Sequence, residues 1–210
     1  MKNINTIIDY NKHPINDVKY IQECNSLIKK NSLLVLENFL SRNSLLNILK
    51  EAKKLEDQAY YCQQQHTILL SKQSDDLDKN DPLNRLMISD KGCVPHDLIS
   101  KNSDLNILYK SDIFKSFIKN VLNLNNIFPY IDNLSSINLN YYQIGQQLGW
   151  HFDNASFAIT LMIQSSTLGG EFEYITEGRD SKDNYINKEL ITNIIDGKNK
   201  PKQLDVNDGT

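Results

Sequence analysis

A histidine and an aspartate, His151 and Asp153, lie two residues apart in the string Gly-Trp-His-Phe-Asp-Asn of residues 149–154. In an extended strand, residues i and i+2 point to the same side, so an imidazole nitrogen and a carboxylate oxygen can meet at one point. Both atoms are ligands for divalent metal ions. A His-x-Asp pair on its own is more often a pair of surface polar residues than a metal site. Here it follows a Gly-Trp dipeptide and precedes an apolar run over residues 157–164, and this setting favours the metal site.

Two such ligands and a second histidine from elsewhere form the facial triad of non-heme Fe(II) oxygenases. The triad occupies three positions of an octahedral ion and leaves three for a co-substrate and oxygen. The sequence therefore predicts an Fe(II) site in which His151 and Asp153 are the metal ligands and the catalytic residues.

The same string, together with Phe157 and the later sequence Gly170–Tyr174, resembles the Fe(II)/2-oxoglutarate-dependent oxygenases. It looks most like the branch that acts on free amino acids, which includes hydroxylases and radical halogenases. The resemblance is specific over residues 136–185 and looser back to about residue 31. It implies a double-stranded β-helix (jelly-roll or cupin-like), Fe(II), 2-oxoglutarate as co-substrate, and a small-molecule substrate that we expect to be an amino acid.

Asp153 also bears on the type of reaction. In the halogenases of this family a small residue replaces the carboxylate and opens a coordination position for chloride. The carboxylate is present here, so the resemblance implies hydroxylation of an unactivated carbon. Trp150 and Asn154, which flank the pair, are expected to contact the substrate.

A second set of polar residues lies on the predicted strand 136–144. Asn138, Asn140 and Tyr142 alternate along it and therefore share one face. This face either lines a pocket for a polar ligand or is simply hydrated, and the sequence favours neither. On the first interpretation, Asn140 and Tyr142 contact the co-substrate 2-oxoglutarate.

Two residues that the resemblance implies cannot be found. The second iron histidine, and the arginine that pairs with the far carboxylate of 2-oxoglutarate, are expected on strands after the Asp-Gly-Thr of residues 208–210. His13, His66 and His96 all precede the pair, and we expect them to be ordinary surface or core histidines. Arg179 is the only arginine after the pair, and we do not assign it as the keto-acid anchor.

Two explanations follow: the chain is a fragment of a longer reading frame, or it is a short product that has lost its chemistry. We favour the fragment, because the motif before the break is intact. The function is then predicted for the intact form, and the 210-residue chain is expected to be inactive. A catalytically inactive, metal-free binding module on a jelly-roll scaffold is the rival hypothesis. An oxygenase acting on a protein side chain is a third.

The composition and the charge limit the partners and the cellular compartment that we expect for the protein. The 210 residues carry a formal charge of −3, with a pI near 5.8, so we expect no nucleic acid and no membrane as a partner. Cys24, Cys62 and Cys93 form no C-x-x-C pair and are expected to be reduced thiols of a cytoplasmic protein. The sequence makes no prediction of the oligomeric state.

The predicted fold class is α+β in one domain of residues 1–210. Seven of the eight glycines follow residue 144, which predicts a mainly helical part over 1–124. The first part of the β-helix core, incomplete at the C-terminus, follows over 125–210, with the N-terminal helices packed outside. Periodicity and capping residues predict helices over 17–29, 41–58 and 111–123 and strands over 32–38, 63–71, 127–131, 136–144 and 157–164. Residues 72–92 and 178–200 are predicted to be loops, the second with a short segment over 189–195.

Overall fold

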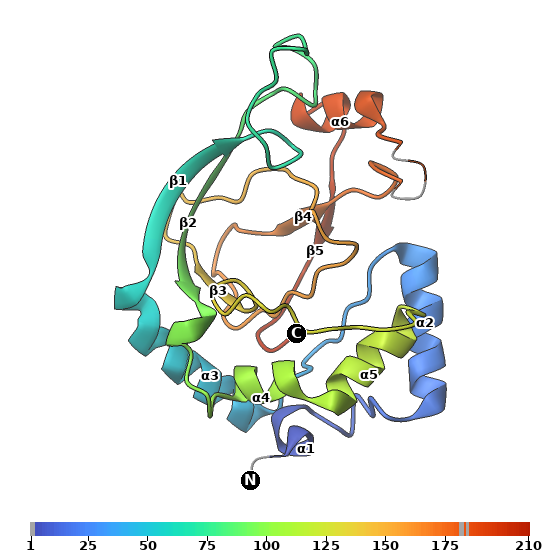
Figure 1. The fold of residues 1–210 in the computed structure, drawn as a ribbon, viewed down its shortest axis with the longest axis vertical. Helices are drawn as coiled ribbons and strands as arrows, with labels where there is room; N and C mark the ends of the chain where they lie inside the picture. The colour runs from blue at the N-terminus through green and yellow to red at the C-terminus, as the bar shows by residue number, and fades with distance from the viewer. Residues whose placement is uncertain (1–2, 181–182, 184) are drawn as a thin grey trace.

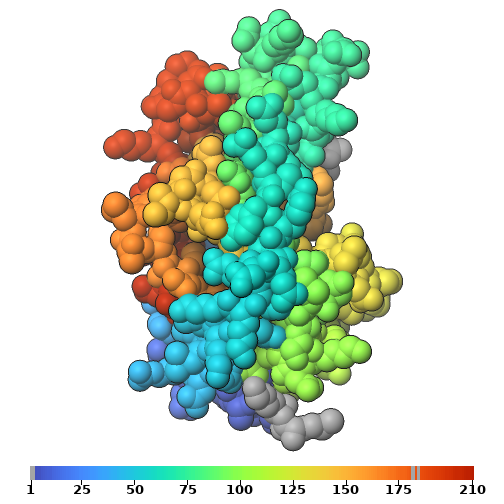
Figure 2. All heavy atoms as spheres, turned by 90° about the vertical axis from the view of Figure 1, so that its left-hand side faces the viewer, coloured from blue at the N-terminus to red at the C-terminus, as the bar shows by residue number. Residues whose placement is uncertain are grey.

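Most of the helices gather at one end of the molecule, one helix lies at the opposite end, and two small antiparallel sheets lie between them (Figure 1). The side formed by the larger sheet faces the viewer in Figure 2. The structure, a computed structural model, describes residues 3–180, 183 and 185–210. Its helices are α1 (Ile4–Ile7), α2 (Val18–Asn31), α3 (Arg42–Leu55), α4 (Asp104–Lys110), α5 (Asp112–Val121) and α6 (Lys188–Ile195). Its strands are β1 (Tyr60–His66), β2 (Met87–Pro95), β3 (Asn138–Tyr141), β4 (Phe172–Tyr174) and β5 (Lys202–Leu204). The predicted α+β class is confirmed.

The three long helices begin within one residue of their predicted starts at residues 17, 41 and 111. The side chains of Asp17, Ser41 and Ser111 accept hydrogen bonds from backbone N–H groups in the first turns of α2, α3 and α5. α4 was not predicted, because its seven residues are too few to show a clear helical period.

The larger sheet has the strand order β1-β2-β3, with both pairs antiparallel. Gly92 of β2 lies opposite Tyr61 of β1, and a Cβ at Gly92 would lie 2.7 Å from the Tyr61 ring. The tyrosine therefore covers a position at which only glycine leaves it room. β2 occupies part of the predicted loop 72–92, so that prediction is wrong for residues 87–92.

One face of this sheet packs on the helices. Val94 and Leu139 belong to the same buried cluster as Ile48 of α3 and Phe117 of α5. The Tyr141 hydroxyl donates a hydrogen bond of 2.7 Å to the backbone carbonyl of Ala52 in α3. The core therefore lies between the sheet and the helices, and the opposite face of the sheet points away from them.

The second sheet consists of β4 and β5. Gly169 and Gly170, both with positive φ, lead into β4. β5 lies at residues for which the sequence predicted no strand. None of the helices in the described part of the chain is both long and apolar enough to cross a membrane.

Three predicted strands are wrong: residues 32–38, 127–131 and 157–164 are irregular. Their apolar side chains are not enough, because a strand needs a neighbour for its backbone groups. In the first segment, Leu34 and Leu36 pack against the core without strand pairing. In the third, only Met162 is held at both backbone groups, by Gly209 and Thr210. The described strands form sheets of three and two strands, and by themselves they do not make up a double-stranded β-helix.

Candidate metal centre

His151 and Asp153 lie side by side in an irregular segment of the chain between β3 and β4. The Nε2 atom of His151 is 3.5 Å from Oδ1 of Asp153, and their side chains are 21% and 54% exposed. Two ligands at right angles on one ion, each about 2.1 Å from it, lie about 3 Å apart. The observed separation is close to that value, and the side chains are open enough for an ion to enter.

A backbone carbonyl orients the imidazole of His151. The Nδ1 atom is 2.8 Å from the carbonyl oxygen of Gly149, which can only accept a hydrogen bond. Nδ1 therefore carries a proton. In a neutral imidazole the lone pair would be on Nε2, the atom that lies 3.5 Å from Asp153 Oδ1. Metal-binding histidines are commonly held in this way by their second nitrogen.

A buried histidine supports the segment from β1. His66 donates through Nδ1 to the carbonyl of Thr67, at 2.8 Å, so its Nε2 accepts from the Ser89 hydroxyl, at 2.7 Å. The Ser89 oxygen in turn accepts the Gly149 N–H at 3.1 Å. The three residues form a chain of hydrogen bonds from β1 through β2 to the residue whose carbonyl orients His151.

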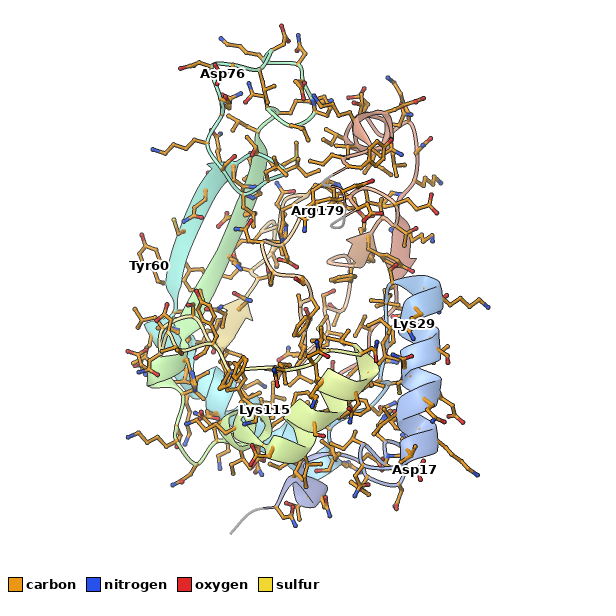
Figure 3. The ribbon with its side chains drawn as sticks, turned by 45° about the vertical axis from the view of Figure 1, so that its right-hand side comes forward. Asp17, Lys29, Tyr60, Asp76, Lys115 and Arg179 are labelled. Carbon is orange, nitrogen blue, oxygen red and sulfur yellow. The ribbon has the colours of Figure 1, made fainter. Side chains whose placement is uncertain are left out.

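Phe152, between the two candidate ligands, is held from two sides. Its N–H donates to the carbonyl of Ile68 at 2.8 Å. The Arg179 guanidinium lies 5.1 Å from the centre of the Phe152 ring and donates to the Asp153 carbonyl at 2.9 Å. Figure 3 labels Arg179 in the region between the larger sheet and α6. Arg179 therefore contacts the backbone that carries the pair.

Among the described residues, His151 and Asp153 are the candidate ligands of this site, and no third ligand joins them. No group of three His, Cys, Asp or Glu residues that could hold a metal is found among the described residues. The nearest histidine found in contact is His66, whose ring centre is 6.2 Å from that of His151. Both nitrogens of His66 are engaged by Thr67 and Ser89, so it offers no free lone pair.

The other two histidines are also used in packing. His13 contacts the Tyr20 hydroxyl at 2.6 Å and the Glu37 carbonyl at 2.9 Å. His96 lies 2.6 Å from the side-chain oxygen of Asn106 and also contacts Ser136. Both residues are buried, as expected of core histidines.

The remaining predicted site residues lie at two places. Trp150, half-buried, and Asn154, exposed, flank the pair in the chain. Asn140 is exposed on β3, and Tyr142, 48% exposed, directly follows that strand. No hydrogen bond between described residues joins Asn140 or Tyr142 to His151 or Asp153. The structure therefore brings His151 and Asp153 together. The residues expected to contact the co-substrate, Asn140 and Tyr142, lie on or next to β3 of the larger sheet.

Burial changes the titration of the groups beside Asn140. The pKa of Tyr142 is raised by burial and by the nearby thiol of Cys93. The pKa of Cys93 is also raised by burial, an effect that Lys91 opposes. These interactions place Lys91, Cys93 and Tyr142 near one another on the sheet.

Sequence reasoning missed Ser89 and Lys91 because both lie in a stretch that was predicted to be a loop. The alternation of Met87, Ser89, Lys91 and Cys93 was visible in the sequence, but only Cys93 and Met87 have apolar character. No protein-family model matches the chain, and no curated protein is significantly similar to it.

Proposed function

We propose that this chain carries the metal-binding core of an Fe(II)- and 2-oxoglutarate-dependent oxygenase that hydroxylates a small substrate, which we expect to be a free amino acid. The observation that carries the proposal is the proximity of His151 and Asp153, whose Nε2 and Oδ1 atoms are 3.5 Å apart while the Nδ1 atom of His151 contacts the Gly149 carbonyl. These are two of the three donors of the facial triad.

The sheets support the same proposal at the level of the fold. The β1-β2-β3 sheet and the β4-β5 pair would be parts of the two facing sheets of a double-stranded β-helix (Figure 1). The candidate ligands lie in the chain between β3 and β4, where the segment passes from one sheet to the other.

The roles of the side chains follow from their chemistry. His151 and Asp153 would bind Fe(II), and Trp150 and Asn154 would contact the substrate. Bound Fe(II), with 2-oxoglutarate and oxygen, supplies the oxidising power, while the protein supplies orientation and binding. Asp153 occupies a coordination position with a carboxylate, which favours hydroxylation over halogenation. Turnover needs a third ligand, so hydroxylation is proposed for a form of the protein that provides one.

Mn(II) titration followed by electron paramagnetic resonance tests the metal site. Two protein ligands should give weak but site-specific binding, and His151→Ala and Asp153→Ala should each remove it. Asp76→Ala is the matched control, because Asp76 is an exposed carboxylate in the loop after β1 (Figure 3). Equal Mn(II) binding by the wild type and both ligand variants would contradict the proposal.

A metal-free binding module on the same scaffold is the second candidate. It is favoured by one observation, that the described residues contain no group of three metal-binding side chains. On this alternative, Mn(II) binding is either undetectable or unchanged in the variants, so the same titration separates the two functions.

A further inference from the structure

The face of the larger sheet that points away from the helices is polar. Successive side chains of a strand point to opposite faces, so Ser89, Lys91 and Cys93 share one face of β2. The register pairs Lys91 with Cys62 of β1 and Cys93 with Asn140 of β3. Gly92 and Val94, which alternate with these residues, lie on the buried side. Lys91 therefore lies on the strand at the centre of the sheet, on its open face.

The strand register and one side-chain contact connect the members of this face. The Cys93 sulfur is 3.6 Å from the side-chain oxygen of Asn138. Lys91 and Tyr142 both interact electrostatically with the Cys93 thiol. Asn138, Asn140 and Tyr142 are exposed, whereas Lys91 and Cys93 are half-buried. Lys91 is therefore less exposed than the amide and phenol side chains that lie beside it on this face.

Lys91 forms no ion pair with any acidic residue that the structure describes. Among the described residues, no carboxylate oxygen lies within 4.0 Å of its ammonium group, although other lysines of this chain, such as Lys188, form such pairs. A half-buried charge is stabilised by an opposite charge that shares its surroundings. The groups around Lys91 are neutral hydrogen-bonding side chains, a set that suits an anion with several oxygen atoms.

The same face leads to the candidate metal ligands. Lys91 is two residues from Ser89, about 7 Å along the strand, and the Ser89 hydroxyl accepts the Gly149 N–H. The flexible stem of a lysine lets its ammonium group adjust to a ligand over part of that distance. A small molecule with a carboxylate at one end could therefore extend from Lys91 toward His151.

We propose that Lys91 binds a carboxylate of a small organic acid, with Asn140 and Tyr142 as its hydrogen-bonding neighbours. The binding of a carboxylate rests on this face alone, whereas the identity of the ligand, 2-oxoglutarate or an amino acid, rests on the proposed function. Lys91 would supply the positive charge that holds the carboxylate. Asn140 and Tyr142, which were expected to contact the co-substrate, would add hydrogen bonds beside it.

Calorimetric titration of the metal-free 210-residue chain, in EDTA and at low salt, tests the anchor. The probes are 2-oxoglutarate, succinate and L-leucine. Loss of one charge-assisted hydrogen bond corresponds to about tenfold or more in affinity. We expect that loss in Lys91→Met and Lys91→Gln, with binding retained in Lys91→Arg. Lys72→Met, in an exposed loop, is the matched control and should bind as the wild type does.

The arms of the experiment separate the sources of the carboxylate. Lys91-dependent binding of 2-oxoglutarate and succinate assigns the face to the co-substrate, and Lys91-dependent binding of L-leucine alone assigns it to an amino acid. Absence of binding by the wild type, or undiminished binding by both uncharged variants, overturns the inference. Mn(II) binding is measured separately on the same variants. If no Mn(II) binding is detected while Lys91-dependent binding of a carboxylate persists, the proposed function is wrong and the carboxylate site is retained.

Discussion

The imidazole Nε2 of His66 lies 2.7 Å from the hydroxyl of Ser89, and through this contact a buried residue of β1 supports the segment that carries His151. Because the carbonyl of Thr67 can only accept a hydrogen bond, Nδ1 of His66 donates to it. In a neutral imidazole Nε2 then accepts from the Ser89 hydroxyl, whose oxygen accepts the Gly149 N–H. This support has a consequence for stability and another for metal binding.

Removal of the serine hydroxyl should affect both properties. Ser89→Ala leaves the buried Nε2 of His66 and the Gly149 N–H without their partner, which costs about 1–3 kcal/mol of the free energy of unfolding. Weak Mn(II) binding should fall as well, because Gly149 orients His151. Urea unfolding and Mn(II) titration measure the two effects. Ser26→Ala, at an exposed hydroxyl of α2, is the control and should change neither.

The segment before the pair lies too close to β2 for a larger residue at Gly149. A Cβ there would lie 2.7 Å from the carbonyl oxygen of Ile88, an atom of the strand backbone that cannot move aside. Gly149→Ala should therefore lower the free energy of unfolding by about 1–3 kcal/mol. Gly92→Ala, whose new Cβ meets the Tyr61 ring, should cost less, because a side chain can give way. Thermal unfolding of the two variants compares them, and the reverse order would contradict the packing described for Gly149.

Arg179 should act on the pair through the backbone. Its guanidinium both lies over the Phe152 ring and donates to the Asp153 carbonyl. A lysine cannot reproduce this combination, since it lacks the planar fork of the guanidinium. Arg179→Lys is expected to weaken Mn(II) binding severalfold and to leave the thermal unfolding midpoint nearly unchanged. Arg42→Lys is the control, and equal Mn(II) binding by Arg179→Lys and the wild type would exclude this role.

Acid should release the loop between β1 and β2 from α6. Lys188 pairs with Asp81 at 2.6 Å, and Arg85 pairs with Asp196 at 2.5 Å. Hydrogen bonds to Lys188 and Arg85 lower the pKa of Asp81 and of Asp196. A lowered pKa in the folded state contributes stability that is full above the unfolded value, about 3.9, and is lost as the pH falls through the folded value.

Hydrogen exchange of residues 74–86 and 188–196, measured between pH 5 and pH 2.5, checks this prediction after correction for intrinsic rates. Protection of both segments should fall together below about pH 4. The variant Lys188→Met should lose part of that protection already at pH 5. The pair Asp112–Lys115 lies within α5 and joins no separate segment, so α5 serves as the internal control. If the difference in hydrogen-exchange protection between the loop and α5 does not change with pH, the ion pairs do not cause that difference.

Local signals predicted the long helices and the proximity of His151 and Asp153. Asp17, Ser41 and Ser111 mark helix starts because a cap and the turn that follows it are neighbours in sequence. His151 and Asp153 are close to each other because only one residue separates them, although their segment is irregular and is not the extended strand on which the prediction was based. Both inferences need no knowledge of the rest of the chain.

The strands were harder to predict, because a strand depends on its neighbour. Residues 127–131 and 157–164 are apolar but have no adjacent strand, whereas β2 is polar on one face and is paired on both sides. The support of the pair by Ser89 and the carbonyl contact of Arg179 join residues 60 and 26 positions apart. No local pattern predicts such contacts, and the same holds for the position of Lys91 beside Asn140 and Tyr142.

Anomalous diffraction from a crystal soaked in Mn(II) tests whether His151 and Asp153 are metal ligands. A manganese peak is expected between His151 Nε2 and Asp153 Oδ1, each about 2.1 Å from the ion. The peak should be absent from crystals of Asp153→Ala soaked in the same way. Manganese bound only at other carboxylates, with the pair left unoccupied at a saturating concentration, would contradict the assignment of His151 and Asp153 as metal ligands.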